Sequence, residues 1–167
     1  PELSWHEERT ANKVCEFLEA RDIDYQRNVA RTGVVAEIPG RWPSPVVALR
    51  ADMDALLVQE ETGLSFTSKV DGVMHACGHD AHTAILLGAA AELTSGEAPP
   101  LPVRLIFQPA EETGEGAQAM IDAGVLKDVA MIFGGHVDRH FLAGEVAVTE
   151  GSVNASSDSF EIEIFGS

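Results

Sequence analysis

The sequence lacks long hydrophobic runs, is poor in basic residues and contains only two cysteines. Its longest apolar stretch, residues 84–91, is far shorter than the roughly 20 residues that cross a bilayer, so we expect no membrane partner. Lys and Arg number 11 against 27 Asp and Glu, and the net charge of −16 repels phosphate backbones, so we expect no nucleic acid partner. Two distant cysteines cannot build the disulfide framework of a small secreted domain, which favours a reducing, cytoplasmic location.

What the chain does contain is an ordinary globular composition. Of its 167 residues, 45% are hydrophobic and 23% are charged, which suffices for one domain with a sizeable core. The chain opens on Pro1 without an initiator methionine and closes on residues 160–165, where polar and apolar residues alternate as in a strand. Because a strand needs a neighbour, we expect the sequence to be a piece of a longer protein.

Hydrophobic periodicity predicts an α/β fold, in which strands alternate with helices. Ser4 stands at a capping-box distance before an amphipathic helix over residues 7–20. Two short β-branched runs, residues 34–38 and 46–49, flank a turn rich in Pro and Gly and are expected to form a hairpin or two adjacent strands. The other predicted elements are helices at 83–93 and 116–123, strands at 103–107, 130–133 and 145–149, and a linker at 152–159.

Polar residues directly follow three of the predicted strands. They are, in chain order, Asp52 and Asp54, Glu111 and Glu112, and His136. In α/β sheets, ligand sites collect beyond the carboxyl ends of the strands. These side chains are therefore expected to converge on one site.

A fourth polar cluster, residues 75–82, leads into the helix at 83–93. Its Cys77 and His79 are two residues apart, which lets both side chains point at one ion, and zinc-like metals accept thiolate, imidazole and carboxylate together. The alternative for Cys77 is a buried apolar thiol, a role that rarely falls to a cysteine among three histidines and an aspartate. Cys15, on the apolar face of the first helix, is interpreted as core.

The adjacent Glu111 and Glu112 can have two different chemical roles. Neighbouring side chains diverge, so one carboxylate can ligate a metal while the other acts as a general base toward a water, as metal-assisted hydrolysis requires. Without the histidine cluster, the same pair indicates only a solvated face. His136 follows two glycines that let backbone or substrate approach closely, although an isolated histidine at a strand end is also a common structural residue.

The remaining polar residues leave alternatives open. His75 and His82 either orient a ligand or cap the loop. Asp52 and Asp54 either hold the ring N–H groups of histidines or simply end a strand.

Three segments stand out as motifs in this order: Arg-Ala-Asp-Met-Asp-Ala-Leu at 50–56, His-Ala-Cys-Gly-His-Asp-Ala-His-Thr-Ala at 75–84 and Gln-Pro-Ala-Glu-Glu at 108–112. They resemble the M20 metallopeptidase family, in the aminoacylase and amidohydrolase branch that includes hippurate hydrolases, N-acetyl-diaminopimelate deacetylases and auxin-conjugate hydrolases. The resemblance implies an incomplete zinc-exopeptidase-like catalytic domain over 1–157, with a mixed, mostly parallel sheet flanked by helices. It also implies that an inserted lid and dimerisation domain begins at 158–167.

The resemblance further implies a two-metal site for zinc, manganese, nickel or cobalt. Its ligands would be Cys77, His79, Glu112 and His136, with Glu111 as the general base. The family supplies one more histidine near its carboxyl terminus, and this sequence ends before it. The implied substrate is an N-acyl amino acid or small peptide, whose amide is cleaved as Glu111 takes a proton from water and returns it to the leaving amine. The implied assembly is a homodimer or homotetramer formed through the lid domain.

Two departures and two rival functions accompany the resemblance. Leu57 stands where the family usually has proline, and residues 137–140 lack the usual proline and bulky residues, which affects specificity more than reaction type. A cysteine hydrolase with Cys77 as nucleophile is one rival, although it leaves the glutamate pair without a role. The other is a non-catalytic metal-binding domain. We expect the 167-residue chain by itself to be weakly active or inactive.

Overall fold

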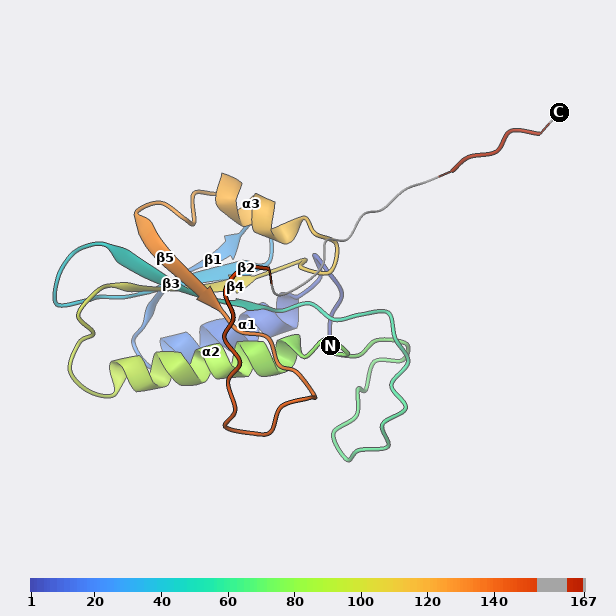
Figure 1. Ribbon diagram of the computed structural model, residues 1–167, viewed down its shortest axis with the longest axis horizontal. Coiled ribbons are helices and arrows are strands. Elements are labelled where there is room, and N and C mark those ends of the chain that lie inside the picture. Colours follow the sequence, from blue (N-terminus) through green and yellow to red (C-terminus); the bar gives the residue numbers. More distant parts are fainter. Residues whose placement is uncertain (153–161, 167) are drawn as a thin grey trace. The chain divides into compact units, whose positions relative to one another are not determined.

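The computed structural model describes residues 1–152 and 162–166 of the chain. Two units are distinguished, Pro1–Val137 and Asp138–Ser167, and all assigned helices and strands belong to the first (Figure 1). Among the described residues, no helix has the length and apolar character needed to span a membrane. The elements are α1 (Glu8–Glu19), β1 (Asp24–Val29), β2 (Gly33–Ile38), β3 (Val46–Asp52), α2 (His79–Thr94), β4 (Val103–Gln108), α3 (Gly116–Asp122) and β5 (Val129–Gly134).

The first unit is built on one five-stranded sheet in the order β1-β2-β4-β3-β5. β3 runs parallel to β4 and to β5, whereas β2 is antiparallel to both β1 and β4. α1 and α2 lie on one face of this sheet and α3 lies on the other (Figure 1). The expected α/β class and mixed sheet flanked by helices are therefore confirmed, although the parallel and antiparallel pairs are equal in number rather than mostly parallel.

Two apolar layers attach the helices to the sheet. Val14 and Leu18 of α1 and Leu105 of β4 belong to the first layer, which also includes α2. Ile106 of β4 and Met120 of α3 belong to the second layer, on the opposite face. β4 contributes to both layers because successive side chains of a strand point to opposite faces of the sheet. Since β4 also lies between two other strands, its apolar side chains are at the centre of the core.

The strand order corrects one prediction. The runs at 34–38 and 46–49 are strands, but they are neither a hairpin nor neighbours, because β4 lies between them and pairs with both. The true hairpin partner of β2 is β1, which sequence analysis missed. β1 is an edge strand with five exposed residues followed by one buried residue, so it carries no alternating hydrophobic pattern.

The strand predicted at 145–149 is also wrong. Its residues have no strand conformation, and the side chains of Val146 and Val148 are 85% and 91% exposed. No strand within residues 1–152 pairs with this run, and an alternating pattern alone does not make a strand without a partner. Residues 162–165 of the predicted strand at 160–165 likewise have no regular structure, whereas 153–161, including most of the predicted linker, lie outside the described residues. The domain division after residue 157 stays a prediction.

The predicted helices are confirmed with two changes. Ser4 does not cap α1, because its hydroxyl donates a hydrogen bond to Asp54; the Glu2 carboxylate instead accepts hydrogen bonds from the backbone N–H groups of Arg9 and Thr10 in the first turn. α2 begins at His79, four residues earlier than predicted, since Gly78 adopts a left-handed conformation (φ 88°) that lets the turn enter the helix directly. This earlier start places a candidate ligand in the first turn of α2.

The position of β4 at the centre of the core leads to a stability prediction. Leu105 is completely buried, so Leu105→Ala should lower the free energy of unfolding by about 2–5 kcal/mol, through lost burial and a cavity. Leu57→Ala is the matched control, because Leu57 is 76% exposed and its truncation should change stability by less than about 0.5 kcal/mol. Urea unfolding followed by circular dichroism measures both, and equal losses would contradict this account of the core.

Candidate metal centre

The carboxyl ends of three strands lie side by side and carry the polar residues singled out in the sequence. Asp52, at the end of β3, pairs in register with Gln108, at the end of β4, and Arg50 pairs with Gly134, at the end of β5. Because these strands are parallel, the segments that follow them leave the sheet at the same edge. The predicted convergence of the three polar clusters is thus what the topology produces.

The fourth cluster joins this edge through the turn before α2. Gly78 separates the two candidate ligands Cys77 and His79, and it has a positive φ. A Cβ atom at Gly78 would lie only 2.3 Å from Cγ2 of Val137, so no other residue fits without displacing that valine. Glycine here both permits the turn and lets the segment after β5 approach it.

The five residues nominated as ligands and base gather in one place. Sγ of Cys77 lies 3.3 Å from Nε2 of His136, and these two residues together with His79 can offer ligand atoms within 4.8 Å of one another. Nε2 of His79 lies 3.7 Å from Oε1 of Glu112 and 3.8 Å from Oε2 of Glu111. His79 is therefore shared between a Cys/His group and a His/Glu/Glu group.

Two atoms of this cluster are buried without a hydrogen-bond partner among the described residues: Nε2 of His79 and Oε1 of Glu112. A buried polar atom that lacks a partner is costly, and both atoms are good ligands for divalent cations. Thiolate, imidazole and carboxylate in one cluster form a donor set typical of zinc and related metals. The residues present therefore fit a divalent metal centre.

Asp54 determines which nitrogen of His79 is available. Its Oδ1 lies 3.1 Å from Nδ1 of His79, while Oδ2 accepts hydrogen bonds from the Ser4 hydroxyl (2.6 Å) and from the backbone N–H of Glu112 (3.0 Å). A carboxylate only accepts, so Nδ1 carries the hydrogen and Nε2 keeps the lone pair that a metal needs. Burial opposes the charge of Asp54, but these hydrogen bonds outweigh it and lower the pKa of Asp54 to about 2.

The contacts of Asp52 show which of its two predicted roles it has, holding a histidine or only ending a strand. Its carboxylate accepts a hydrogen bond from Nδ1 of His82 at 2.6 Å and forms an ion pair with Arg50 at 2.7 Å. The side chain is 1% exposed. Asp52, His79 and His82 also have the spacing of a metal group, but the Asp52 carboxylate is already engaged by these two donors. Asp52 and Asp54 therefore each hold a histidine rather than merely ending a strand.

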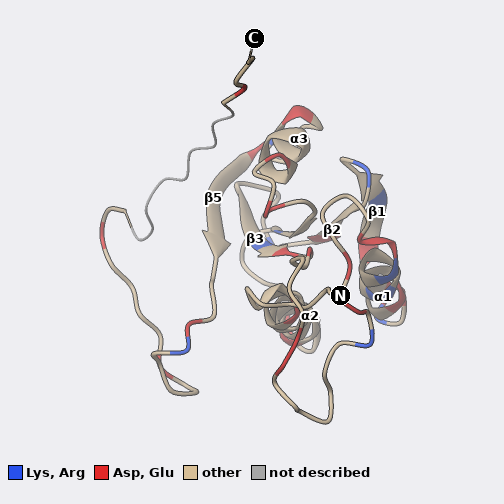
Figure 2. Cartoon of the chain, turned by 90° about the vertical axis from the view of Figure 1, so that its right-hand side faces the viewer, with Lys and Arg blue, Asp and Glu red and all other residues tan. Residues whose placement is uncertain are grey.

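The cluster carries several negative charges. Acidic residues also outnumber basic residues along the whole chain, and Figure 2 shows where both kinds lie. Burial and the negative charges of Glu112 and Glu111 raise the pKa of the Cys77 thiol to about 11. Burial also raises the pKa of Glu112. For His79, burial opposes the charged form, but the Asp54 hydrogen bond and the nearby carboxylates outweigh it and raise its pKa. The surroundings thus favour a cation and disfavour a free thiolate.

Sequence analysis missed two residues that support the centre. Glu7, assigned only to a helix start, is completely buried and accepts hydrogen bonds from the Thr32 hydroxyl and from the backbone N–H groups of Trp5 and Ala110. Through Ala110 it holds the backbone just before Glu111. Ser4, through Asp54, supports His79. Nothing in the local pattern distinguishes these residues from an ordinary helix cap, because their partners lie far away in the sequence.

Two other histidines take minor places. His140 is exposed and pairs with Asp138. Nδ1 of His75 is buried without a partner among the described residues, and none of the groups with metal-ligand spacing includes it.

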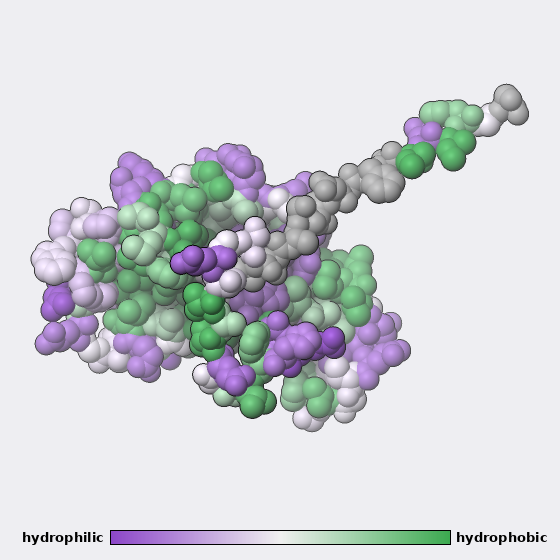
Figure 3. Space-filling model, in the orientation of Figure 1, coloured by the Kyte–Doolittle hydropathy of each residue, from purple (hydrophilic) through white to green (hydrophobic). Residues whose placement is uncertain are grey.

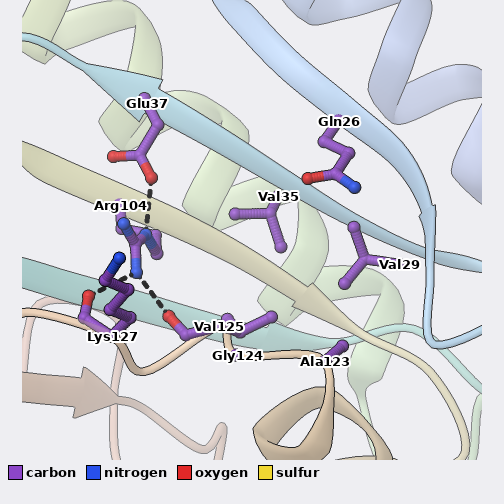
Figure 4. A pocket seen from close by; sticks show the side chains of 9 residues that line it. All are labelled: Gln26, Val29, Val35, Glu37, Arg104, Ala123, Gly124, Val125 and Lys127. Carbon is purple, nitrogen blue, oxygen red and sulfur yellow. Dashed lines mark hydrogen bonds and ion pairs between the residues drawn. The ribbon is translucent and has the colours of Figure 1, made fainter.

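A small hollow on the α3 face contains none of the predicted site residues (Figure 4). Arg104 lies in it and donates hydrogen bonds to Glu37 and to the backbone carbonyl groups of Val125 and Lys127 (Figure 4). Arg104 thereby ties β2 and β4 to the segment after α3.

Comparisons with known proteins agree with this geometry. The model of peptidase family M20/M25/M40 matches residues 48–166. N-acetylcysteine deacetylase of Bacillus subtilis is 49% identical over 99% of this chain and 44% of its own length. IAA-amino acid hydrolase ILR1-like 4 of Arabidopsis thaliana is 48% identical over 99% of this chain and 38% of its own length.

A solved structure extends the likeness to the fold. The YXEP protein of Bacillus subtilis, described as a dinuclear metal binding peptidase from the M20 family, has a TM-score of 0.79 and 51% identity over 83% of this chain and 39% of its own. The chain thus spans about two fifths of the length of these relatives. The family model covers well over half of the chain, including the three motifs that carried the resemblance. The chain belongs to peptidase family M20/M25/M40.

Proposed function

We propose that this chain carries the metal-binding part of a metal-dependent amidohydrolase that cleaves the amide bond of N-acyl amino acids or small peptides. The observation that carries the proposal is a pair of buried atoms, Nε2 of His79 and Oε1 of Glu112, which have no hydrogen-bond partner in the part of the chain that the structure describes and lie beside a second carboxylate and a Cys/His pair. A structural cluster would satisfy these atoms internally, whereas a metal centre leaves them free.

Four residues are proposed as ligands: Cys77, His79, Glu112 and His136. Two divalent ions, with zinc, manganese, nickel and cobalt as the candidates, would supply Lewis-acid polarisation of the scissile carbonyl and a counter-charge for the acidic cluster. The description of the YXEP relative as dinuclear supports two ions rather than one. A negatively charged substrate approaching a chain of charge −16 also requires such local positive charge.

Glu111 is proposed as the general base. Its side chain is 40% exposed, compared with 20% for Glu112, so it faces the solvent-accessible side from which a substrate and water arrive. Its carboxylate takes the proton of the attacking water and returns it to the leaving amine, while Glu112 stays a ligand. The backbone before Glu111 is held by the buried Glu7, which keeps this carboxylate in place.

The proposed substrate class rests on the relatives and is limited to amides of amino acids. The names of two relatives specify the deacetylation of N-acetylcysteine and the hydrolysis of an IAA-amino acid conjugate, both amides of an amino-acid nitrogen. The rival function with Cys77 as a nucleophile is disfavoured, since a thiol with a pKa of about 11 is protonated at neutral pH and its negative surroundings do not activate it. A homodimer or homotetramer and a cytoplasmic location stay predictions.

The ligand assignment predicts metal content. After loading with zinc or manganese and desalting, the chain should retain metal by plasma mass spectrometry, and Cys77→Ser and Glu112→Ala should lose most of it because each removes a ligand. Glu111→Gln is the matched control: it should retain metal, and any hydrolysis of N-acetyl amino acids should fall about 10²–10⁴-fold. Retention by Glu112→Ala, or loss by Glu111→Gln, would reverse the roles of the two glutamates. Robust turnover by the isolated chain would contradict the expectation that it is weakly active or inactive.

The role of Asp54 predicts a tautomer effect. In Asp54→Asn, the amide oxygen can keep the bonds from Ser4 and Glu112 while the amide nitrogen donates to Nδ1 of His79, which places the imidazole hydrogen on Nε2. Metal affinity should therefore fall about 10–100-fold with the fold intact. Asp80→Asn, on the exposed side of the same helix turn, makes the same charge change and should leave affinity nearly unchanged. Equal effects of the two variants in a metal titration would show that charge, not the tautomer, is responsible.

A further inference from the structure

The segment that follows β5 is attached to the start of α2 by four contacts. The backbone N–H of Val137 donates a hydrogen bond to Nε2 of His82 at 2.9 Å. The Val137 side chain lies directly over Gly78, where a Cβ atom would collide with it. The third contact joins Nε2 of His136 to Sγ of Cys77. In the fourth, the rings of His82 and His136 pack edge to face with their centroids 4.6 Å apart.

His82 has a fixed polarity in this arrangement. Its side chain is 3% exposed, and its Nδ1 lies 2.6 Å from Oδ1 of Asp52. The carboxylate can only accept, so Nδ1 carries the hydrogen, and the N–H of Val137 can only donate, so Nε2 must accept. Both partners therefore require the same neutral tautomer. Nε2 of His82 is occupied by the backbone and is not offered as a ligand.

The Val137 backbone connects this arrangement to His136, through its N–H on one side and its carbonyl group on the other. While its N–H is bound by His82, the carbonyl oxygen of Val137 lies 2.8 Å from Nδ1 of His136. A carbonyl accepts, so Nδ1 of His136 carries the hydrogen and its Nε2 lone pair faces Cys77. Asp52, His82, Val137 and His136 thus form one chain of contacts that ends at the metal centre.

β5 itself gives His136 little support. Within the described residues β5 pairs on one side only, with β3. Its Met131, Ile132 and Phe133 are 56%, 51% and 56% exposed, and apolar surface is visible over the strand in Figure 3. A ligand at the end of such a strand depends on contacts beyond the strand for its position.

We propose that His82, held by Asp52, is a positioning residue that fixes the Val137 backbone and thereby presents Nε2 of His136 to the metal centre. This inference rests on the proposed function, because it takes His136 to be a ligand. His82 touches neither metal nor substrate in this role. It acts through the hydrogen bond to Val137, and its ring also packs edge to face against the His136 ring, with centroids 4.6 Å apart.

Cobalt binding to the full chain tests the proposal, with affinity and the thiolate-to-cobalt absorption band as readouts. His82→Leu removes both hydrogen bonds and should weaken affinity about 10–100-fold and alter the band. His82→Gln can still accept from Val137 and should restore affinity to within about threefold of wild type. Thr83→Val is the matched control, because it removes a neighbouring buried hydrogen bond to the Asp52 carbonyl without touching Val137, and it should bind cobalt like wild type.

A double-mutant cycle separates the two hypotheses. His136→Ala should weaken cobalt binding by itself, and His82→Leu should add little in that background, since its effect passes through His136. If His136→Ala leaves affinity unchanged, the proposed ligand set fails and this inference with it. If His136→Ala weakens binding but His82→Leu does not, or its effect is fully additive, the positioning role alone is overturned.

The imidazole tautomer of wild-type His82 provides a measurement that does not depend on a variant folding. Long-range ¹H–¹⁵N spectra should show the hydrogen on Nδ1. A hydrogen on Nε2 would overturn the proposal, because Val137 would then have no acceptor.

Discussion

The Asp54 carboxylate is the interaction on which the rest of the centre depends. One oxygen holds the ring of His79, and the other accepts from Ser4 near the amino terminus and from the backbone of Glu112 after β4. Three segments far apart in the sequence are thus bound to a single buried group. Because Asp54 can only accept hydrogen bonds, it also decides that Nε2 of His79 is left with a lone pair. A helix start, a strand end and a protonation state are determined together by one side chain.

A second constraint is the density of negative charge around that carboxylate. Glu111, Glu112, Asp52 and Asp54 surround one histidine and one thiol, and the thiol responds with a raised pKa. Such a cluster disfavours nucleophilic cysteine chemistry and favours bound cations. A divalent ion would stabilise the negative charges of the carboxylates and the thiolate, which burial and mutual repulsion destabilise. The same physical reasoning therefore argues for the metal-dependent function and against its nearest rival.

Much of the site could be predicted because its chemistry is local. The motif at 75–84 places a thiol and an imidazole two residues apart, and Glu111 and Glu112 are adjacent, so their roles could be proposed without any structure. The supporting residues could not be predicted in this way. Glu7 lies 103 residues from the Ala110 backbone that it holds, and His82 lies 55 residues from Val137. The edge strand β1 was not predicted for a related reason, because an exposed strand has no alternation of hydrophobic and polar residues that would indicate it.

The sequence by itself determined the α/β class, most helices and strands, the residue types of the candidate metal centre and the family to which the chain belongs. These follow from periodicity, composition and short motifs, all of which are properties of neighbouring residues. Tertiary structure alone decided the strand order, with β4 inserted between β2 and β3, and the absence of a strand at 145–149. It also decided which aspartate holds which histidine. Pairing and hydrogen bonding join residues that are distant along the chain, and no local pattern specifies which of the available partners will meet.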